Sequence, residues 1–178
     1  SLLSQSIIST LPQYPPHSPL SNDTVDSILQ SIQAFGGRAE IYGSRLLRAD
    51  IQSSDIDVLL LLQDDGPLVP TSPKHMDKIR AVKEYLLGLE GIDGVRVIQG
   101  ARYPILKMQY KGISIDLTIC PVPNPEDIDL EDPDLALRPA FSQLSPLAQT
   151  LLNGAANSHA ILRSLAQPDD TPDKLSKR

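Results

Sequence analysis

The sequence predicts an α+β fold with a mixed, mostly antiparallel sheet of about five strands, packed by helices on one face. Residues 56–63, IDVLLLLQ, form a continuous apolar run, which is typical of a strand buried on both faces. Residues 104–110 and 113–119 are strand candidates separated only by Lys111 and Gly112, a pair that favours a tight hairpin turn. Segments with helical spacing lie before and after residues 56–63, so helices can cover the sheet.

Start and stop signals mark the two main predicted helices. The apolar residues at helical spacing in the first are Val25, Ile28, Leu29, Ile32 and Phe35. Its stop signal is the pair Gly36 and Gly37, because glycine ends helices readily. The second helix begins with Ser72 as cap and Pro73 at its first position, and its stop signal is Gly91.

Two further strands complete the predicted sheet, at residues 39–42 and 95–99, and the first of them ends at Gly43. Within residues 113–119 apolar and polar residues alternate along the chain. Because successive side chains of a strand point to opposite faces, Asp116 is expected to face away from the apolar side.

The segment after the last strand predicts a loop followed by helices. Residues 126–134 carry six carboxylates and no basic residue, which favours a solvated loop whose aspartates cap short helices. Short helices are expected around residues 143–153 and 158–166.

The length of 178 residues indicates a single domain with a core. Four of the residues 12–19 are prolines, so residues 1–20 are expected to form an extended arm. Residues 21–166 are the predicted folded domain, and residues 167–178 are expected to be a disordered tail.

Composition excludes several classes of protein. The longest apolar stretch, Val58 to Leu62, is far shorter than the roughly 20 residues that cross a bilayer, and no signal peptide is seen, so no membrane partner is expected. Cys120 is the single cysteine, which fits an intracellular, reducing compartment. The net charge of −6 has the wrong sign for tight RNA binding by this chain alone. His17, His75 and His159 have no partner at ligand spacing and are interpreted as surface residues.

Five residues form a constellation that suits nucleotide chemistry: Gly43, Ser44, Asp55, Asp57 and Asp116. Glycine lets the backbone approach a triphosphate closely, and a serine hydroxyl with neighbouring amides can donate to phosphate oxygens. Asp55 and Asp57 lie two positions apart on a strand, so both carboxylates point to one face and can share hard cations such as magnesium. Asp116 follows on a later strand, and the three carboxylates can converge at one sheet edge.

This pattern resembles the signature of the polymerase-beta-like nucleotidyltransferase superfamily, and within it most closely the palm of eukaryotic poly(A) polymerases. The spacing between Ser44 and Asp55 is similar to theirs. The segment YPILKMQYKGISIDLTI looks like their third-carboxylate region, and PEDIDLEDPDL and the LNG of residues 152–154 resemble the segment that follows it. The resemblance covers roughly residues 40–165 and makes residues 21–166 the catalytic domain.

The resemblance implies a function and a mechanism. Asp55, Asp57 and Asp116 would bind two Mg²⁺ ions, with Mn²⁺ as a substitute, and Asp116 would also help to deprotonate an RNA 3′-hydroxyl. Gly43 and Ser44 would hold the triphosphate of ATP. The product would be RNA extended by adenylate without a template, as in mRNA polyadenylation, and a true poly(A) polymerase would work in the nucleus.

Two further positions match the family pattern without a defined role, Lys107 and Asn153, and both are candidates for nucleotide binding. Tyr103 stands where the family usually has a smaller aliphatic residue, and it either stacks on a base or packs under the sheet, the second being favoured. The family's middle domain and RNA-binding domain would follow the palm, and neither is present, so they or a partner subunit are expected as partners.

Two alternatives to polyadenylation stay open. One is a minimal nucleotidyltransferase that modifies a small molecule, a protein or a transfer RNA, which the acidic net charge favours. The other is a truncated palm that is inactive without its missing domains, which the start at Ser1 rather than methionine suggests.

Overall fold

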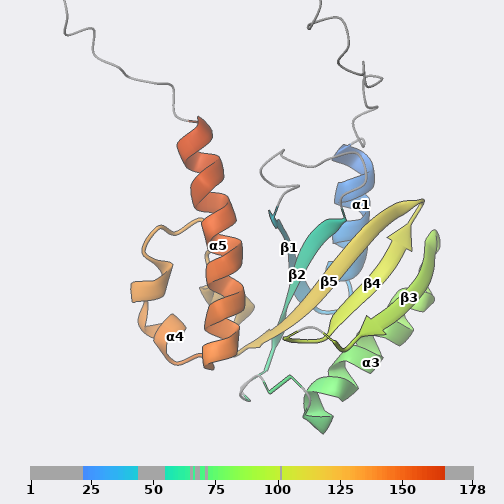
Figure 1. The fold of residues 1–178 in the computed structure, drawn as a ribbon, viewed down its shortest axis with the longest axis horizontal. Helices are drawn as coiled ribbons and strands as arrows, with labels where there is room; N and C mark the ends of the chain where they lie inside the picture. The colour runs from blue at the N-terminus through green and yellow to red at the C-terminus, as the bar shows by residue number, and fades with distance from the viewer. Residues whose placement is uncertain are drawn as a thin grey trace, which may run out of the picture.

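A computed structural model describes residues 22–43, 55–64, 66, 69–70, 72–100 and 102–166 (Figure 1). The predicted arm at residues 1–20, the predicted tail at residues 167–178 and Ser44 lie outside the described residues. Within the described part of the chain, no helix combines the length and the apolar character that are needed to span a bilayer.

The sheet has five strands: β1 (Gly37–Tyr42), β2 (Ile56–Gln63), β3 (Ile92–Ile98), β4 (Ile105–Tyr110) and β5 (Ile113–Val122). Their spatial order is β1-β2-β5-β4-β3. Only β2 and β5 are parallel, and the other three neighbouring pairs are antiparallel. The predicted mixed, mostly antiparallel sheet of five strands is therefore confirmed, and β2 has the predicted bounds.

The turn between β4 and β5 is the predicted one. Lys111 and Gly112 have φ angles of 48° and 82°. A two-residue type I′ hairpin turn, whose twist matches that of the flanking strands, needs a positive φ at both central residues. Gly112 adopts this conformation at the second position without steric cost. This hairpin sets the register of β5, and with it the place of Asp116 opposite Lys107.

Helices α1 (Asn22–Gln33) and α3 (Pro73–Leu87) pack on one face of the sheet. The core between them and the sheet is continuous; its fully buried members include Ile28, Ile32, Ile79, Leu86, Leu60, Met108, Ile115 and Leu117. As predicted, Pro73 opens α3 and Ser72 caps it, with the Ser72 Oγ accepting from the His75 N–H at 3.2 Å. The helix ends at Gly88, one turn before the predicted Gly91.

The opposite face of the sheet carries a second, smaller layer that the sequence analysis did not predict. It contains the 3-10 helices Pro125–Asp127 and Leu135–Leu137, and the α-helices α4 (Pro139–Ser142) and α5 (Pro146–Ala166). Its buried apolar residues include Leu59, Leu61, Cys120, Val122, Leu130, Phe141, Leu151, Leu152 and Ala155. α5 stands beside the sheet, where it contacts β1 and β5 (Figure 1).

Three local predictions were wrong. The two short helices expected around residues 143–153 and 158–166 form the single helix α5, which continues through Gly154. His75 and His159 are buried rather than exposed, and each keeps one ring nitrogen without a hydrogen-bond partner among the described residues. The last strand was expected to end before Pro121 but continues through it to Val122.

Candidate active site

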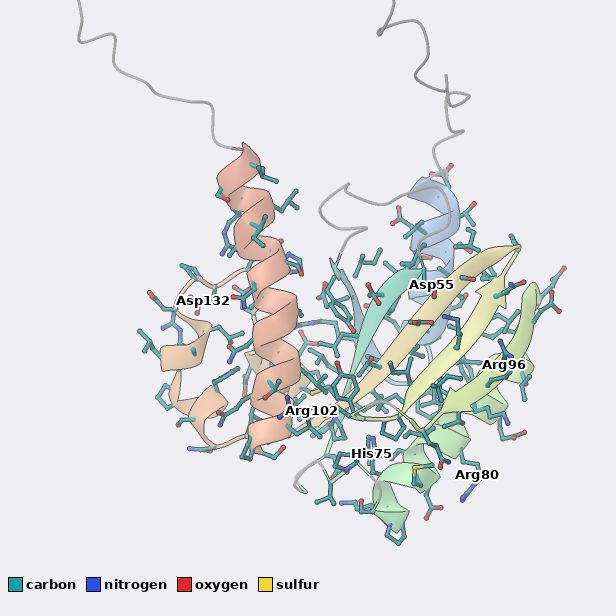
Figure 2. All side chains as sticks on the ribbon, in the orientation of Figure 1. Asp55, His75, Arg80, Arg96, Arg102 and Asp132 are labelled. Carbon is teal, nitrogen blue, oxygen red and sulfur yellow. The ribbon has the colours of Figure 1, made fainter. Side chains whose placement is uncertain are left out.

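The strand register aligns charged and polar side chains in a row across the sheet. Tyr42 on β1 lies opposite Asp57 on β2, Asp57 opposite Asp116 on β5, and Asp116 opposite Lys107 on β4. Residues directly opposite on neighbouring strands project to the same face. Asp55, two positions before Asp57, projects to that face as well. The structure thus brings the three predicted carboxylates together on two neighbouring strands, close to the centre of the sheet rather than at an edge strand (Figure 2 labels Asp55).

Lys107 is the positive counterpart of these carboxylates. Its Nζ contacts the Asp55 Oδ2 directly and lies 3.2 Å from the Asp116 Oδ1. The hydrogen bond to Asp55, assisted by Asp116, raises the pKa of the lysine. The Asp116 Oδ1 is buried and has no aligned hydrogen bond within the described residues, so the ammonium is its compensation there.

Asp57 differs from the other two carboxylates because it has no ion pair among the described residues. Burial, followed by the charges of Asp116 and Asp55, raises the pKa of the Asp57 carboxyl, and Lys107 opposes this effect only in part. Three carboxylates served by one ammonium leave an excess of negative charge, which is the electrostatic setting of a cation site.

The residues fit magnesium by their chemistry, since magnesium prefers carboxylate oxygens and keeps waters and substrate phosphates as its other ligands. Within the described residues no group of three or more acidic, histidine or cysteine side chains forms a ready metal cage. The ammonium of Lys107 already contacts one oxygen of Asp55 and one of Asp116. A metal held by those same two oxygens would compete with Lys107 for them.

Gly43 borders the row on the β1 side. Its φ angle is +72°, and an added Cβ would lie 2.5 Å from the Asp57 Oδ2, so only glycine fits both the backbone and the space. Its N–H donates to the Ser158 Oγ on α5 at 3.1 Å. Sequence analysis missed Ser158, because a contact between residues 115 positions apart leaves no local pattern.

Two tyrosines, Tyr42 and Tyr103, pack against the second apolar layer. Tyr42 lies partly buried with its hydroxyl 3.5 Å from the Thr118 Oγ1, and burial raises the pKa of the phenol to about 12, so it stays protonated. Tyr103 packs partly buried against the same layer, which agrees with the favoured interpretation from the sequence. Asn153 is exposed on α5 and makes no side-chain hydrogen bond within the described residues.

A mixed five-stranded sheet with an aspartate pair on one strand, a third aspartate in register on its parallel neighbour and a positive-φ glycine beside them is the architecture of a nucleotidyltransferase palm. Residues 20–122 match the family model described as the poly(A) RNA polymerase, mitochondrial-like, central palm domain. The chain belongs to this family.

The chain is also similar to a curated protein in sequence and to a solved structure in fold. The poly(A) polymerase PAPa of Candida albicans is 28% identical over 139 residues, which are 75% of this chain and 22% of that protein. The solved non canonical poly(A) polymerase complex GLD-2 - GLD-3 matches 80% of this chain and 45% of the solved chain at 16% identity, with a TM-score of 0.50. This chain thus spans about a fifth of the length of its curated relative and less than half of the solved one.

Proposed function

We propose that this chain carries the catalytic site for template-independent transfer of AMP from ATP to the 3′-hydroxyl of an RNA. The observation that carries the proposal is the register of β2 and β5, which sets Asp57 beside Asp116 with Asp55 on the same face. A catalytic carboxylate triad of this kind suits the in-line displacement at phosphorus. ATP and RNA are proposed because the matching family model and the Candida albicans relative are both described as poly(A) polymerases.

Each side chain of the row has a task in this reaction. Asp55, Asp57 and Asp116 would hold Mg²⁺ or Mn²⁺, and such ions supply charge stabilisation to the attacking and departing oxygens. Asp116 accepts the proton of the attacking hydroxyl. Gly43 allows close approach of the triphosphate on the β1 side, together with Ser44. Lys107, whose Nζ lies against Asp55 and Asp116, would add positive charge for the phosphates at this site.

Partners of the palm follow from its size and charge. A net charge of −6 gives weak attraction to a polynucleotide, so tight RNA binding would come from additional domains or from a partner subunit. The share of the curated relative that this chain spans agrees with such an arrangement.

Primer extension tests the proposal. The purified chain is incubated with each labelled nucleoside triphosphate, magnesium and a short oligoadenylate, beside the variants Asp57→Asn and Asp116→Asn. The matched control is Asp26→Asn, which removes the same charge from an exposed position on α1. Extension by ATP that persists in the control and disappears in both site variants supports the proposal. Extension that survives Asp116→Asn overturns the catalytic assignment, and ATP binding without extension makes catalysis dependent on further domains.

A second candidate is transfer of a nucleotide to a small molecule, a protein or a transfer RNA. The acidic net charge favours the first two of these acceptors, because they need less phosphate neutralisation than a polynucleotide. Mass spectrometry of candidate acceptors after incubation with ATP separates the two. An added mass of one AMP on a small molecule, a protein or a transfer RNA, without extension of the oligoadenylate, assigns the chain to this second class.

A further inference from the structure

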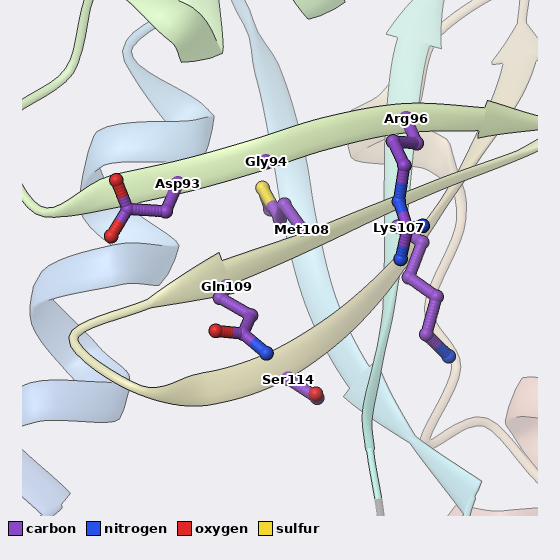
Figure 3. A pocket seen from close by; sticks show the side chains of 7 residues that line it. All are labelled: Asp93, Gly94, Arg96, Lys107, Met108, Gln109 and Ser114. Atoms are coloured by element: carbon purple, nitrogen blue, oxygen red, sulfur yellow. The ribbon is translucent and has the colours of Figure 1, made fainter.

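A pocket of about 240 Å³ opens on the carboxylate face beside the row. Its lining residues come from β3, β4 and the start of β5: Asp93, Gly94, Arg96, Lys107, Met108, Gln109 and Ser114 (Figure 3). The second layer packs elsewhere, over β1 and the later parts of β2 and β5. Pockets for whole small-molecule ligands usually measure roughly 300–1,000 Å³, so this one suits a fragment such as a phosphate group.

A β-bulge in β3 shapes the pocket. The register shifts between Asp93 and Arg96, and Gly94 within the bulge has a φ angle of +65°. On a regular strand, residues three positions apart point to opposite faces, whereas the extra residue of a bulge turns both to the same face. The bulge therefore brings Arg96 onto the carboxylate face, where it lies directly opposite Lys107.

Two cations directly opposite each other on neighbouring strands are unfavourable unless other groups compensate them. Lys107 is compensated by Asp55 and Asp116. Arg96 is exposed and has no ion pair within the described residues. Asp93 lies at the end of the pocket away from Arg96 and Lys107, with Gln109 and Ser114 between them (Figure 3). The Arg96 end of the pocket thus has an uncompensated guanidinium with free N–H donors, which suits a phosphate anion.

We propose that this pocket is a phosphate-binding subsite that takes a phosphodiester of the acceptor strand, with Arg96 as its main anchor. The choice of the acceptor rests on the proposed function. In an in-line displacement the attacking and leaving oxygens lie on opposite sides of the phosphorus. Gly43, the proposed triphosphate side, is on the β1 side of Asp57, and the pocket is on the β4–β3 side of Asp116. The acceptor therefore enters from the side of the pocket.

Binding of a fluorescently labelled short oligoadenylate, followed by anisotropy with magnesium and without nucleoside triphosphate at low salt, tests the subsite independently of turnover. Arg96→Ala is expected to weaken binding roughly tenfold, as for loss of a hydrogen bond to a charged group. Arg96→Lys should recover part of the affinity. In Arg96→Ala the log–log slope of affinity against salt concentration should become shallower by about 0.7 for each single-strand phosphate that is no longer neutralised.

The matched control is Arg80→Ala, which removes one exposed arginine from α3, the helix on the opposite face of the sheet (Figure 2 labels Arg80). A second arm measures ATP binding by calorimetry, which should change less than twofold in Arg96→Ala. Weakened ATP binding with unchanged oligoadenylate binding would assign the pocket to the triphosphate and overturn the acceptor subsite.

Two further results would overturn the acceptor subsite. One is an equal effect of Arg96→Ala and Arg80→Ala on oligoadenylate binding, and the other is no binding by the unmodified chain up to millimolar concentration. Failure of primer extension alongside Arg96-dependent binding would instead count against catalysis by this chain alone and leave the subsite supported.

Discussion

The two faces of the sheet are composed differently. On the face toward α1 and α3, the alternate residues of β2 and β5 are apolar along the whole length of both strands. On the opposite face the same strands change character, from Asp57 and Asp116 to Leu59, Leu61 and Cys120 under α5. One face therefore stabilises the fold throughout, while the other is divided between a charged site and a second core.

The comparison shows how a short strand can serve stability and chemistry together. The side chains of Val58, Leu60 and Leu62 hold β2 against the first core, so the backbone that carries Asp57 is rigid. A backbone held by packing can keep carboxylates close to each other despite their repulsion. Sites on strands are precise for this reason. The following predictions test this division of tasks, in order of decreasing effect.

Asp57→Asn should reduce nucleotide transfer about 10³-fold, since charge stabilisation by a metal site contributes several kcal/mol to the barrier. It should not lower stability. The folded-state pKa of Asp57 is raised, so its contribution to stability is present at low pH and is lost as pH rises through that pKa. At neutral pH the neutral variant should melt at the same or a higher temperature. Calorimetry of Asp57→Asn beside Asp26→Asn checks this. A clear drop in melting temperature in Asp57→Asn alone would show that the charged part of this sheet face also stabilises the fold.

Leu60→Ala and Leu61→Ala compare the two cores at adjacent positions of β2. Both side chains are fully buried, Leu60 in the first core and Leu61 in the second. Each change should lower the free energy of unfolding by roughly 2–5 kcal/mol, through reduced burial and the remaining cavity. Chemical denaturation measures both. A cost for Leu61→Ala below about 1 kcal/mol would mean that the second layer does not unfold together with the sheet.

Gly43→Ala tests the position where the carboxylate site meets α5 of the second layer, since Gly43 lies against Asp57 and bonds to Ser158. The left-handed backbone should cost roughly 1–2 kcal/mol, and the added Cβ must displace the Asp57 carboxylate, which it would approach to 2.5 Å. Stability should therefore fall slightly and transfer strongly. Gly100→Ala is the matched control, because Gly100 has open space around its Cβ position and no positive φ. Equal activity of the two variants would contradict the role of Gly43.

His75 is a candidate pH-sensitive group in α3, on the face of the sheet that α1 and α3 cover. It lies buried in α3 with its Nδ1 unpartnered among the described residues, and burial, then the charge of Lys78, lowers its pKa below the ordinary 6.5, with Asp64 opposing. Its neutral form is the one that folding favours, so stability should fall as pH drops below about 6.5, by at most ~1.4 kcal/mol per pH unit. His75→Leu should remove this slope. Parallel stability curves of both proteins between pH 7 and pH 5 would contradict it.

Local signals predicted several elements well. β2 begins and ends where its apolar run does, and the Lys111 and Gly112 pair forms the turn that its composition favours. Alternation in β5 placed Asp116 on the polar face without any knowledge of its neighbours. These features depend on side-chain period and turn chemistry, which a short stretch of sequence contains in full.

Packing overrode local signals elsewhere. Gly154 costs about 1 kcal/mol inside a helix, which burial of Leu151, Leu152 and Ala155 outweighs, so α5 is continuous. Pro121 lies within β5 because, beyond Thr118, β5 has β2 as its only paired neighbour among the described residues, and a strand with an open side tolerates a proline.

The order of residues alone was enough to predict the strand periods, the shared face of Asp55 and Asp57 and the family to which the chain is similar. The folded chain was needed to show that Lys107 compensates Asp55 and Asp116, that Ser158 accepts from Gly43, and that a bulge turns Arg96 onto the carboxylate face. The physical reason is the range of the interactions. Side-chain period and turn geometry are set within a few residues, whereas strand order, register and burial depend on contacts between segments far apart in the chain.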